Sequence, residues 1–208
     1  MSTAADLRVE KVHVWRGDRH VLQGVSLRVG EGELLHVSGP NGTGKTTLLR
    51  VVSGLLRPEQ GSVWWRGKTI SGAATDYQIE LAYASHEPAL KSDLTALENL
   101  RFMVGLKRRV AISELKACLE RTGVAGCADL PARVLSAGQR RRVALARVLA
   151  FRAPLWVLDE PFTNLDTAGS VLVTALLEEH VQQGGLALVV AHHDLRVGVE
   201  TQHLGLHG

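Results

Sequence analysis

The sequence predicts an α/β fold in which a nucleotide-type sheet is interrupted by a helical insertion. First, the apolar run LLHVSG at residues 34–39 leads directly into a glycine-rich loop, and a helical pattern over residues 46–53 follows. Second, the runs LWVLDE (155–160) and LALVVAHH (186–193) are apolar and bounded by turns, which is typical of strands buried on both faces. Third, residues 94–150 carry helical patterns with little strand signal.

The remaining strands are predicted from alternation of apolar and polar residues. Residues 7–15, LRVEKVHVW, alternate like a half-buried strand, and residues 25–29 form a second such segment that ends in the turn Gly30-Glu31-Gly32. Two more strands are expected at residues 61–66 and 79–84. The amino-terminal part of the chain is therefore expected to be rich in strands.

Helical periodicity dominates the middle of the chain and returns once near its end. Helices are expected within 94–104, 112–124 and 136–150, and again over 169–183, where Gly184-Gly185 ends the pattern. We therefore expect a single domain spanning residues 1–208. Its core is predicted to comprise about 1–87 and 151–208, and its helical subdomain about 88–150.

Composition narrows the classes of protein. The chain has 208 residues, of which 45% are hydrophobic and 22% charged, as in ordinary globular domains with a substantial core. A net charge of +3 is too weak to indicate a nucleic-acid partner. Cys118 and Cys127 lack metal or disulfide spacing, so we expect reduced thiols. We expect no signal peptide and no membrane span, so any action on a membrane requires a partner.

Residues 39–47, GPNGTGKTT, form a complete phosphate-binding loop. Glycines allow the backbone to approach phosphates closely with positive φ, and its N–H groups then face the anion beside the positive end of the following helix. Lys45 is expected to reach the β- and γ-phosphates, and Thr46 to ligate Mg²⁺. The sequence thus predicts ATP and Mg²⁺ as cofactors. The ATP-binding residues expected here are Gly39, Pro40, Asn41, Gly42, Thr43, Gly44, Lys45, Thr46 and Thr47.

A second carboxylate for the metal is expected at the end of the strand LWVLDE. Open α/β sheets bind ligands at the carboxyl ends of their strands, which places Asp159 beside the phosphate loop as a magnesium ligand. Glu160 follows immediately and is expected to lie near the γ-phosphate, where it would polarise an attacking water. An apolar run followed by DE is a weak signal alone, but it becomes strong together with the loop upstream.

The segment Leu135-Ser136-Ala137-Gly138-Gln139, followed by RRRVALARVLA, resembles the signature of ATP-binding cassette (ABC) ATPases. The resemblance extends over essentially the whole chain and implies a P-loop NTPase fold of ABC type, with a RecA-like core and a helical subdomain. It further implies that Asp166 is the D-loop aspartate and that His193 is the catalytic switch histidine, with His192 as the rival. Trp15 matches the aromatic residue that stacks on adenine, although an ordinary core tryptophan is the alternative.

In this family the signature of one subunit closes over ATP held by another, so the resemblance implies a homodimer that forms on ATP binding. The residues expected to act across the dimer are Ser136, Ala137, Gly138 and Gln139. Two positions depart from the usual pattern. Ala137 replaces a glycine, a small change that we expect closure to survive. His86 stands where a glutamine ordinarily contacts Mg²⁺ and the attacking water; it is an additional metal-ligand candidate, and the neighbouring Glu87 is the alternative.

These departures, with LTALENLRF and RAPLWVLDEPFTNLD, are similar to the ATPase subunits of bacterial cytochrome c maturation systems, usually described as haem exporters. The resemblance implies integral membrane permease subunits as partners, a peripheral location on the cytoplasmic side of the bacterial inner membrane, and ATP turnover coupled to haem handling or to release of a haem-loaded chaperone. We expect no direct haem binding by this chain, since CxxCH is absent and His203 and His207 are interpreted as a solvated tail.

Three alternatives remain open at this point. The first is the ATPase subunit of another small ABC exporter. The second is a soluble ABC ATPase that acts on ribosomes or DNA, which is disfavoured because such proteins carry tandem or split cassettes. The third is a nucleotide-binding structural protein without hydrolysis, against which Glu160 and His193 argue.

Overall fold

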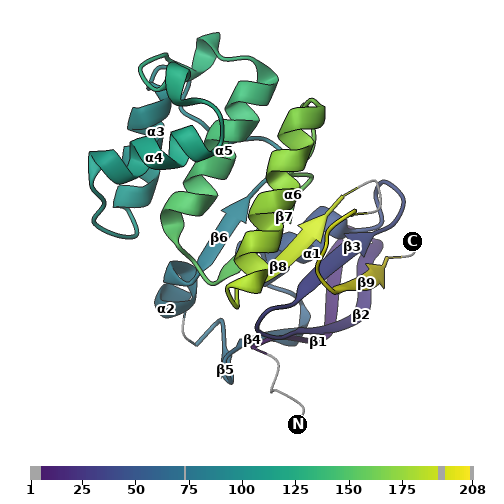
Figure 1. The fold of residues 1–208 in the computed structure, drawn as a ribbon. Helices are drawn as coiled ribbons and strands as arrows, with labels where there is room; N and C mark the ends of the chain where they lie inside the picture. The colour runs from purple at the N-terminus through teal and green to yellow at the C-terminus, as the bar shows by residue number, and fades with distance from the viewer. Residues whose placement is uncertain (1–5, 73, 192–194, 207–208) are drawn as a thin grey trace.

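The computed structural model describes residues 6–72, 74–191 and 195–206. A parallel five-stranded sheet in the order β6-β7-β8-β3-β9 forms its centre (Figure 1). Layers on both faces bury these strands, with the exception of the edge strand β9. Their bounds are β3 Leu34–Ser38, β6 Leu81–Ala84, β7 Leu155–Asp159, β8 Leu186–Val190 and β9 Thr201–Gly205.

An antiparallel sheet in the order β2-β1-β4-β5 packs beside the parallel sheet (Figure 1). Buried and partly exposed residues alternate along the first half of β1, as the sequence pattern predicts for a strand with one buried face. A turn at Gly17-Asp18 joins β1 to β2, and Gly17 adopts a φ of 57° there. The bounds are β1 Leu7–Arg16, β2 Arg19–Val29, β4 Gln60–Trp65 and β5 Lys68–Thr69.

Helices α3, α5 and α6 each follow a residue whose side chain accepts a hydrogen bond from the first turn. Thr95 and Ser136 each form a capping box, with Glu98 and Gln139 respectively, and Asp166 caps the helix that follows it. The bounds are α1 Lys45–Val52, α2 Ala74–Ile79, α3 Ala96–Gly105, α4 Ile112–Arg121, α5 Ala137–Phe151 and α6 Thr167–Gln182, with short 3₁₀ helices at Ala125–Cys127 and Ala132–Val134.

Two hydrophobic cores lie on opposite faces of the parallel sheet. Along β7, Trp156 and Leu158 enter the core shared with α3 to α6, whereas Leu155 and Val157 enter the core shared with α1 and the antiparallel sheet. Successive side chains of a strand point to opposite faces, so a strand covered on both sides must be apolar at every position. This explains the continuous apolar runs.

Helices α3, α4 and α5 pack on one another at the end of the molecule away from the antiparallel sheet (Figure 1). Their grouping follows the region for which the sequence predicts a helical subdomain. The boundaries at about 88–150 stay a prediction, because α5 also contacts β6 of the sheet.

Several elements differ from the sequence prediction. Helix α2 was not predicted. Residue 79, which was expected to begin a strand over 79–84, is the last residue of this helix. Strand β2 begins well before residue 25, and β9 was missed altogether. The interpretation of His203 as part of a solvated tail was wrong for the backbone, since His203 lies in β9 opposite His36, although its side chain is exposed. His207 lies outside the described residues.

Candidate nucleotide site

The predicted phosphate loop and the predicted carboxylates meet in one pocket. Strand β3 leads into the loop and β7 ends at Asp159, and only β8 separates these two strands in the sheet. Their carboxyl ends therefore meet at the same edge. The pocket there has a volume of about 520 Å³ and is lined by Arg16, Arg19, Val21, Asn41, Gly42, Gly44, Lys45, Thr46, Thr47, His86, Asp159, Glu160 and Val190.

The loop backbone adopts a conformation that glycine alone accommodates. Gly39 has a φ of 140°, and a Cβ there would lie 2.3 Å from the carbonyl oxygen of Leu206. Gly44 has a φ of 99°, and a Cβ there would lie 2.8 Å from the side chain of Leu22. Both positions combine positive φ with close packing, so a side chain at either would displace the loop. The packing holds the loop open toward the pocket.

Cations surround this loop. The Nζ of Lys45, which is 7% exposed, donates hydrogen bonds to the carbonyl oxygens of Gly39 at 2.7 Å and Pro40 at 2.9 Å. Arg19 donates from Nη2 to the carbonyl oxygen of Gly42 at 2.8 Å, and Arg16 lines the same pocket. Together with the amino end of α1, these groups favour a polyphosphate anion.

Arg16 and Arg19 were missed by sequence reasoning. Both flank the turn between β1 and β2, far from the loop in sequence. The signal that was available is the short segment RGDR between two predicted strands, which places two cations at the tip of a hairpin. Nothing local in the sequence indicates that this hairpin tip reaches the phosphate loop.

The residues predicted as magnesium ligands fit a hard divalent cation. Asp159 is 2% exposed, and its Oδ2 has no hydrogen-bond partner within the described part of the chain. Burying a carboxylate oxygen costs free energy unless a cation or a hydrogen-bond donor contacts that oxygen. The Thr46 side chain is exposed and lines the same pocket. No group of three or more His, Cys, Asp or Glu residues suited to a metal occurs in the described ranges, so phosphates and water would supply the remaining ligands.

Glu160 lies next to Asp159 at the same pocket and is 9% exposed. Its backbone has a φ of 53°, in the left-handed region, and its N–H donates to the carbonyl oxygen of Val190 at 3.0 Å. A non-glycine residue in that region costs on the order of 1 to 3 kcal/mol and is typical of functional positions. The structure thus brings this carboxylate to the phosphate loop, and its role in polarising a water stays a prediction.

The structure separates the two candidates for the glutamine position. His86 lines the pocket, whereas the neighbouring Glu87 does not. A direct contact of His86 with metal or water stays a prediction. The predicted switch residue His193 and its rival His192 lie outside the described residues, although the preceding strand β8 delivers Val190 to the pocket.

Trp15 is half-buried and is not among the residues that line the pocket. It belongs to neither hydrophobic core, so the reading as an ordinary core tryptophan is not supported. Its indole instead stacks on the imidazole of His20, with ring centroids 4.0 Å apart and planes 6° apart. Adenine stacking on Trp15 stays a prediction, supported by its position beside Arg16.

The predicted signature residues lie outside this pocket. Ser136 caps α5, with the Gln139 N–H donating to Ser136 Oγ at 3.1 Å and the Ser136 N–H donating to Gln139 Oε1 at 2.8 Å. Ala137 is exposed, and a Cβ at Gly138 would lie 2.8 Å from the carbonyl oxygen of Asn164. The start of this helix therefore presents its N–H groups to the surface rather than to the nucleotide pocket of its own chain.

Asp166, the predicted D-loop aspartate, makes local contacts. Its Oδ1 accepts hydrogen bonds from the Gly169 N–H at 2.8 Å and from Arg142 Nη2 at 2.9 Å. The bond from the Gly169 N–H, aided by Arg142, holds the pKa of this carboxyl below its usual range. Asp166 thereby orders the segment beside the signature, and its action across a dimer stays a prediction.

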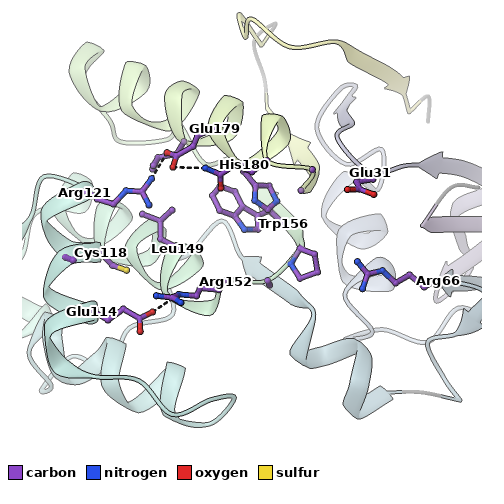
Figure 2. A pocket seen from close by; sticks show the side chains of 17 residues that line it. Glu31, Arg66, Glu114, Cys118, Arg121, Leu149, Arg152, Trp156, Glu179 and His180 are labelled. Carbon is purple, nitrogen blue, oxygen red and sulfur yellow. Dashed lines mark hydrogen bonds and ion pairs between the residues drawn. The ribbon is translucent and has the colours of Figure 1, made fainter. Parts of the chain in front are cut away.

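A second hollow, of about 700 Å³, lies at the amino ends of β7 and β8, on the opposite edge of the sheet (Figure 2). Trp156 stacks on His180 there with ring centroids 3.9 Å apart, and burial lowers the pKa of His180 to about 4. Each arginine of the hollow pairs with a carboxylate: Arg121 with Glu179 at 2.5 Å, Arg152 with Glu114 at 2.9 Å and Arg66 with Glu80 at 2.5 Å. None of the predicted site residues lines it, so it is not the nucleotide site.

Nowhere in residues 6–72, 74–191 and 195–206 is there a helix with the length and apolar character needed to cross a membrane.

Comparison with known proteins gives consistent results. The family model described as "ABC transporter" matches residues 22–163. A protein of Methylococcus capsulatus named "Cytochrome c biogenesis ATP-binding export protein CcmA" is 47% identical over 203 residues, which cover 97% of this chain and 98% of that protein. A protein of Nitrosococcus oceani with the same name is 47% identical over 191 residues, covering 92% and 88% respectively.

Solved structures agree on the fold. A dimeric bacterial ABC transporter cassette is similar with a TM-score of 0.86 at 27% identity, covering 96% of this chain and 94% of that one. A dimeric cassette in a post-hydrolysis state, bound to ADP and phosphate, is similar with a TM-score of 0.83 at 27% identity, covering 90% and 88%.

Proposed function

Because the chain belongs to the ABC transporter family, and is an ABC ATPase of the CcmA type, we propose that it is the ATP-hydrolysing subunit of a cytochrome c biogenesis export complex. The membership confirms the predicted resemblance and the predicted P-loop NTPase fold of ABC type. The observation that carries the proposal is the meeting of Lys45, Asp159 and Glu160 in one pocket whose buried Asp159 oxygen has no partner in the described chain.

The chemistry follows from these side chains. Arg19, Lys45 and the loop N–H groups bind and orient the triphosphate, and Thr46 with Asp159 would hold magnesium. Magnesium bound with ATP neutralises part of the phosphate charge and polarises the terminal phosphoryl group. Glu160 accepts a hydrogen bond from the attacking water and orients it toward the γ-phosphate. The switch role of His193 is part of the proposal on the strength of its position after β8.

The second half of the composite site is proposed to come from another copy of the chain. Ser136 to Gln139 lie at an exposed helix start outside their own pocket, where the helix dipole and the N–H groups not engaged in the capping box can face the γ-phosphate of a partner's ATP. Two of the similar structures are described as dimeric. We therefore propose an ATP-dependent homodimer with two nucleotides at its interface.

A membrane partner is proposed because the relatives are named export proteins, while the described residues contain no membrane-spanning helix. Exposed apolar side chains suited to such a partner occur at the end of α2, in α3 and directly after α3, where Ile79 is 53% exposed, Phe102 45% and Leu106 70%. Lys107, which follows α3, donates to the carbonyl oxygens of Gln78 in α2 and Leu81 in β6. A permease at this surface would place the chain peripherally, on the cytoplasmic side of the bacterial inner membrane.

Coupling to haem handling, or to release of a haem-loaded chaperone, is proposed as the work done by this hydrolysis. The support is the similarity to proteins named for cytochrome c biogenesis and export, together with the histidine at position 86. We propose that the chain itself binds no haem, which then moves through the membrane subunits.

Glu160→Gln tests the catalytic assignment. We expect kcat for Mg²⁺-dependent ATP hydrolysis to fall by about 10²- to 10³-fold, with ATP still bound and the dimer accumulating by size-exclusion chromatography. Glu179→Gln is the matched control, because Glu179 lies exposed at the opposite edge and pairs with Arg121. Unchanged hydrolysis in the Glu160 variant would remove this carboxylate from the chemistry.

The partner is tested by affinity purification of the tagged chain from detergent-solubilised membranes. Co-purification of cytochrome c maturation membrane subunits, with haem-chaperone release blocked by Glu160→Gln, is the expected result. Recovery of a different permease would instead identify another small exporter, and recovery of soluble proteins alone would contradict any transport role.

A further inference from the structure

Arg141 is a buried arginine that none of the predicted roles uses. It lies in the first turns of α5, is 1% exposed, and is the largest of the fully buried side chains in the described part of the chain. Its Nη1 donates a hydrogen bond to the carbonyl oxygen of Ser85 at 2.9 Å, and its Nη2 donates to the carbonyl oxygen of His86. One guanidinium therefore holds two consecutive peptide carbonyls through charge-assisted bonds.

The held segment is the one that brings His86 to the nucleotide pocket. Strand β6 ends at Ala84, so residues 85 and 86 leave the sheet and depend on other contacts for their position. His86 lines the pocket together with Asp159 and Glu160. The guanidinium of Arg141 thus fixes the position of this segment relative to the two carboxylates.

The charge of Arg141 is itself tied to the site. Burial lowers its pKa, while attraction to Asp159 and Glu160 opposes that shift. Its Nε finds no hydrogen-bond partner among the described residues. A buried cation of this kind is retained at a cost in free energy.

The same helix connects this contact to the signature. Ser136 caps α5, and one and a half turns later Arg141 reaches the Ser85–His86 segment. A helix moves as one rigid element, so a shift of its capped start is transmitted to the segment that Arg141 holds. If the signature closes over the nucleotide of a second chain, as the proposed function has it, that closure changes the position of His86 in the first chain's own pocket.

We propose that Arg141 is a positioning residue that ties His86 in one nucleotide pocket to the helix whose signature closes the other pocket, so that the two ATP sites of the homodimer act cooperatively. The inference rests on the proposed function for the existence of the dimer. Arginine suits this role because its rigid planar fork fixes the directions of both donated hydrogen bonds, whereas the ammonium of a lysine rotates freely at the end of a flexible stem.

The kinetic test compares the wild type with Arg141→Met, Arg141→Lys and Arg147→Met. Arg147 is the matched control, since it is also buried on α5, at 4% exposure, whereas the hydrogen bonds from this helix to the carbonyls of Ser85 and His86 come from Arg141. We expect a Hill coefficient for ATP hydrolysis approaching about 2 in the wild type and in Arg147→Met. Arg141→Met is expected to bring it to about 1 and to lower kcat about tenfold, with half-saturation changed by no more than about twofold.

The outcomes separate the inference from the function on which it rests. A wild-type chain without ATP hydrolysis would contradict the proposed function. A wild-type chain that hydrolyses ATP with a Hill coefficient of 1, or an Arg141→Met variant that keeps a coefficient near 2, would overturn the inference and leave the proposed function standing. Arg141→Lys keeps the charge without the fork, so we expect partial recovery of kcat but not of the Hill coefficient.

A measurement on the nucleotide-free protein distinguishes the loss of this contact from a general loss of folding in the variants. Amide hydrogen exchange should be accelerated by about tenfold at residues 85–87 in Arg141→Met and Arg141→Lys, while exchange in β7 and β8 stays as in the wild type. Arg147→Met should leave residues 85–87 unchanged. Wild-type exchange at residues 85–87 in both Arg141 variants would show that the guanidinium does not hold this segment.

Discussion

Substitution of Asp159 by asparagine should affect the nucleotide-free and nucleotide-bound protein in opposite directions. Asp159 is 2% exposed, and its Oδ2 has no partner in the described chain. An amide has nearly the same shape but carries no charge, so it costs less free energy to bury without a partner. We therefore expect Asp159→Asn to stabilise the nucleotide-free fold and to destroy the response to magnesium and ATP.

The magnitude follows from the cost of a buried polar group without a partner, which is about 1 to 3 kcal/mol. Attraction to Arg141 offsets part of this cost, but the hydrogen bonds of Arg141 go to the carbonyls of Ser85 and His86. In a domain of this size, 1 kcal/mol corresponds to roughly 2 to 4 °C, so a rise in Tm of roughly 2 to 12 °C is expected, toward the lower end because of this offset. ATP with Mg²⁺ at about 100 times Kd should add about 2.7 kcal/mol to the wild type and almost nothing to the variant.

The assay is thermal unfolding with and without ATP, in the presence of Mg²⁺ or of EDTA. Asp129→Asn is the matched control, because Asp129 is exposed and outside the pocket, and it should behave as the wild type in every condition. A variant that is less stable than the wild type without nucleotide would refute the argument that the buried Asp159 oxygen is costly. A variant that keeps a magnesium-dependent rise in Tm with ATP would refute the assignment of Asp159 as a metal ligand.

Three further predictions test the loop and the fold. Lys45→Ala removes the ammonium that lies at the loop carbonyls, and ATP affinity measured by calorimetry should fall by at least about 100-fold; a loss below about tenfold would contradict its phosphate role. Gly39→Ala places a Cβ 2.3 Å from the carbonyl oxygen of Leu206 and should lower the free energy of unfolding, measured in urea, by about 3 kcal/mol. Gly67→Ala is the control, since Gly67 has a φ of 79° but open space around it, and it should lower that free energy by about 1 kcal/mol. Equal losses in the two variants would contradict the close packing at Gly39. The pKa of His180 is lowered to about 4 from 6.5, so neutral His180 stabilises the fold fully above about pH 6.5, and this contribution is lost as pH falls toward 4. His180→Gln should flatten the pH dependence of the urea midpoint between pH 4 and 6.5, and an unchanged slope would exclude this histidine as its source.

The phosphate loop was predictable because its determinants are local. Glycines at 39, 42 and 44 must stand at fixed spacing between a strand and a helix, and every one of them has positive φ in the structure. The placement of Asp159 followed from a general rule about strand ends. In contrast, Arg16 and Arg19 reach the loop from a distant hairpin, and no local pattern encodes that contact.

The run Arg140 to Arg142 shows why tertiary contacts of individual side chains could not be predicted from the sequence. In sequence these are three equivalent cations, but helix geometry turns consecutive residues by about 100° and sends them to different surroundings. Arg140 donates to the carbonyl oxygen of Leu135, Arg141 to Ser85 and His86, and Arg142 to Asp166. The missed strand β9 has a related cause, since a short edge strand of mixed polarity leaves little periodicity to detect.

The position of β3 has a consequence for how the protein is made. The strand that leads into the phosphate loop lies between β8 and β9, which are the last two strands of the described chain, and Leu206 beyond β9 packs against Gly39. On the ribosome, β1 and β2 are synthesised early and can pair as a hairpin, whereas β3 emerges long before either of its neighbours exists. The nucleotide pocket is therefore not completed until β8 and β9 have been synthesised, and a nascent chain should not retain ATP until β9 has left the exit tunnel.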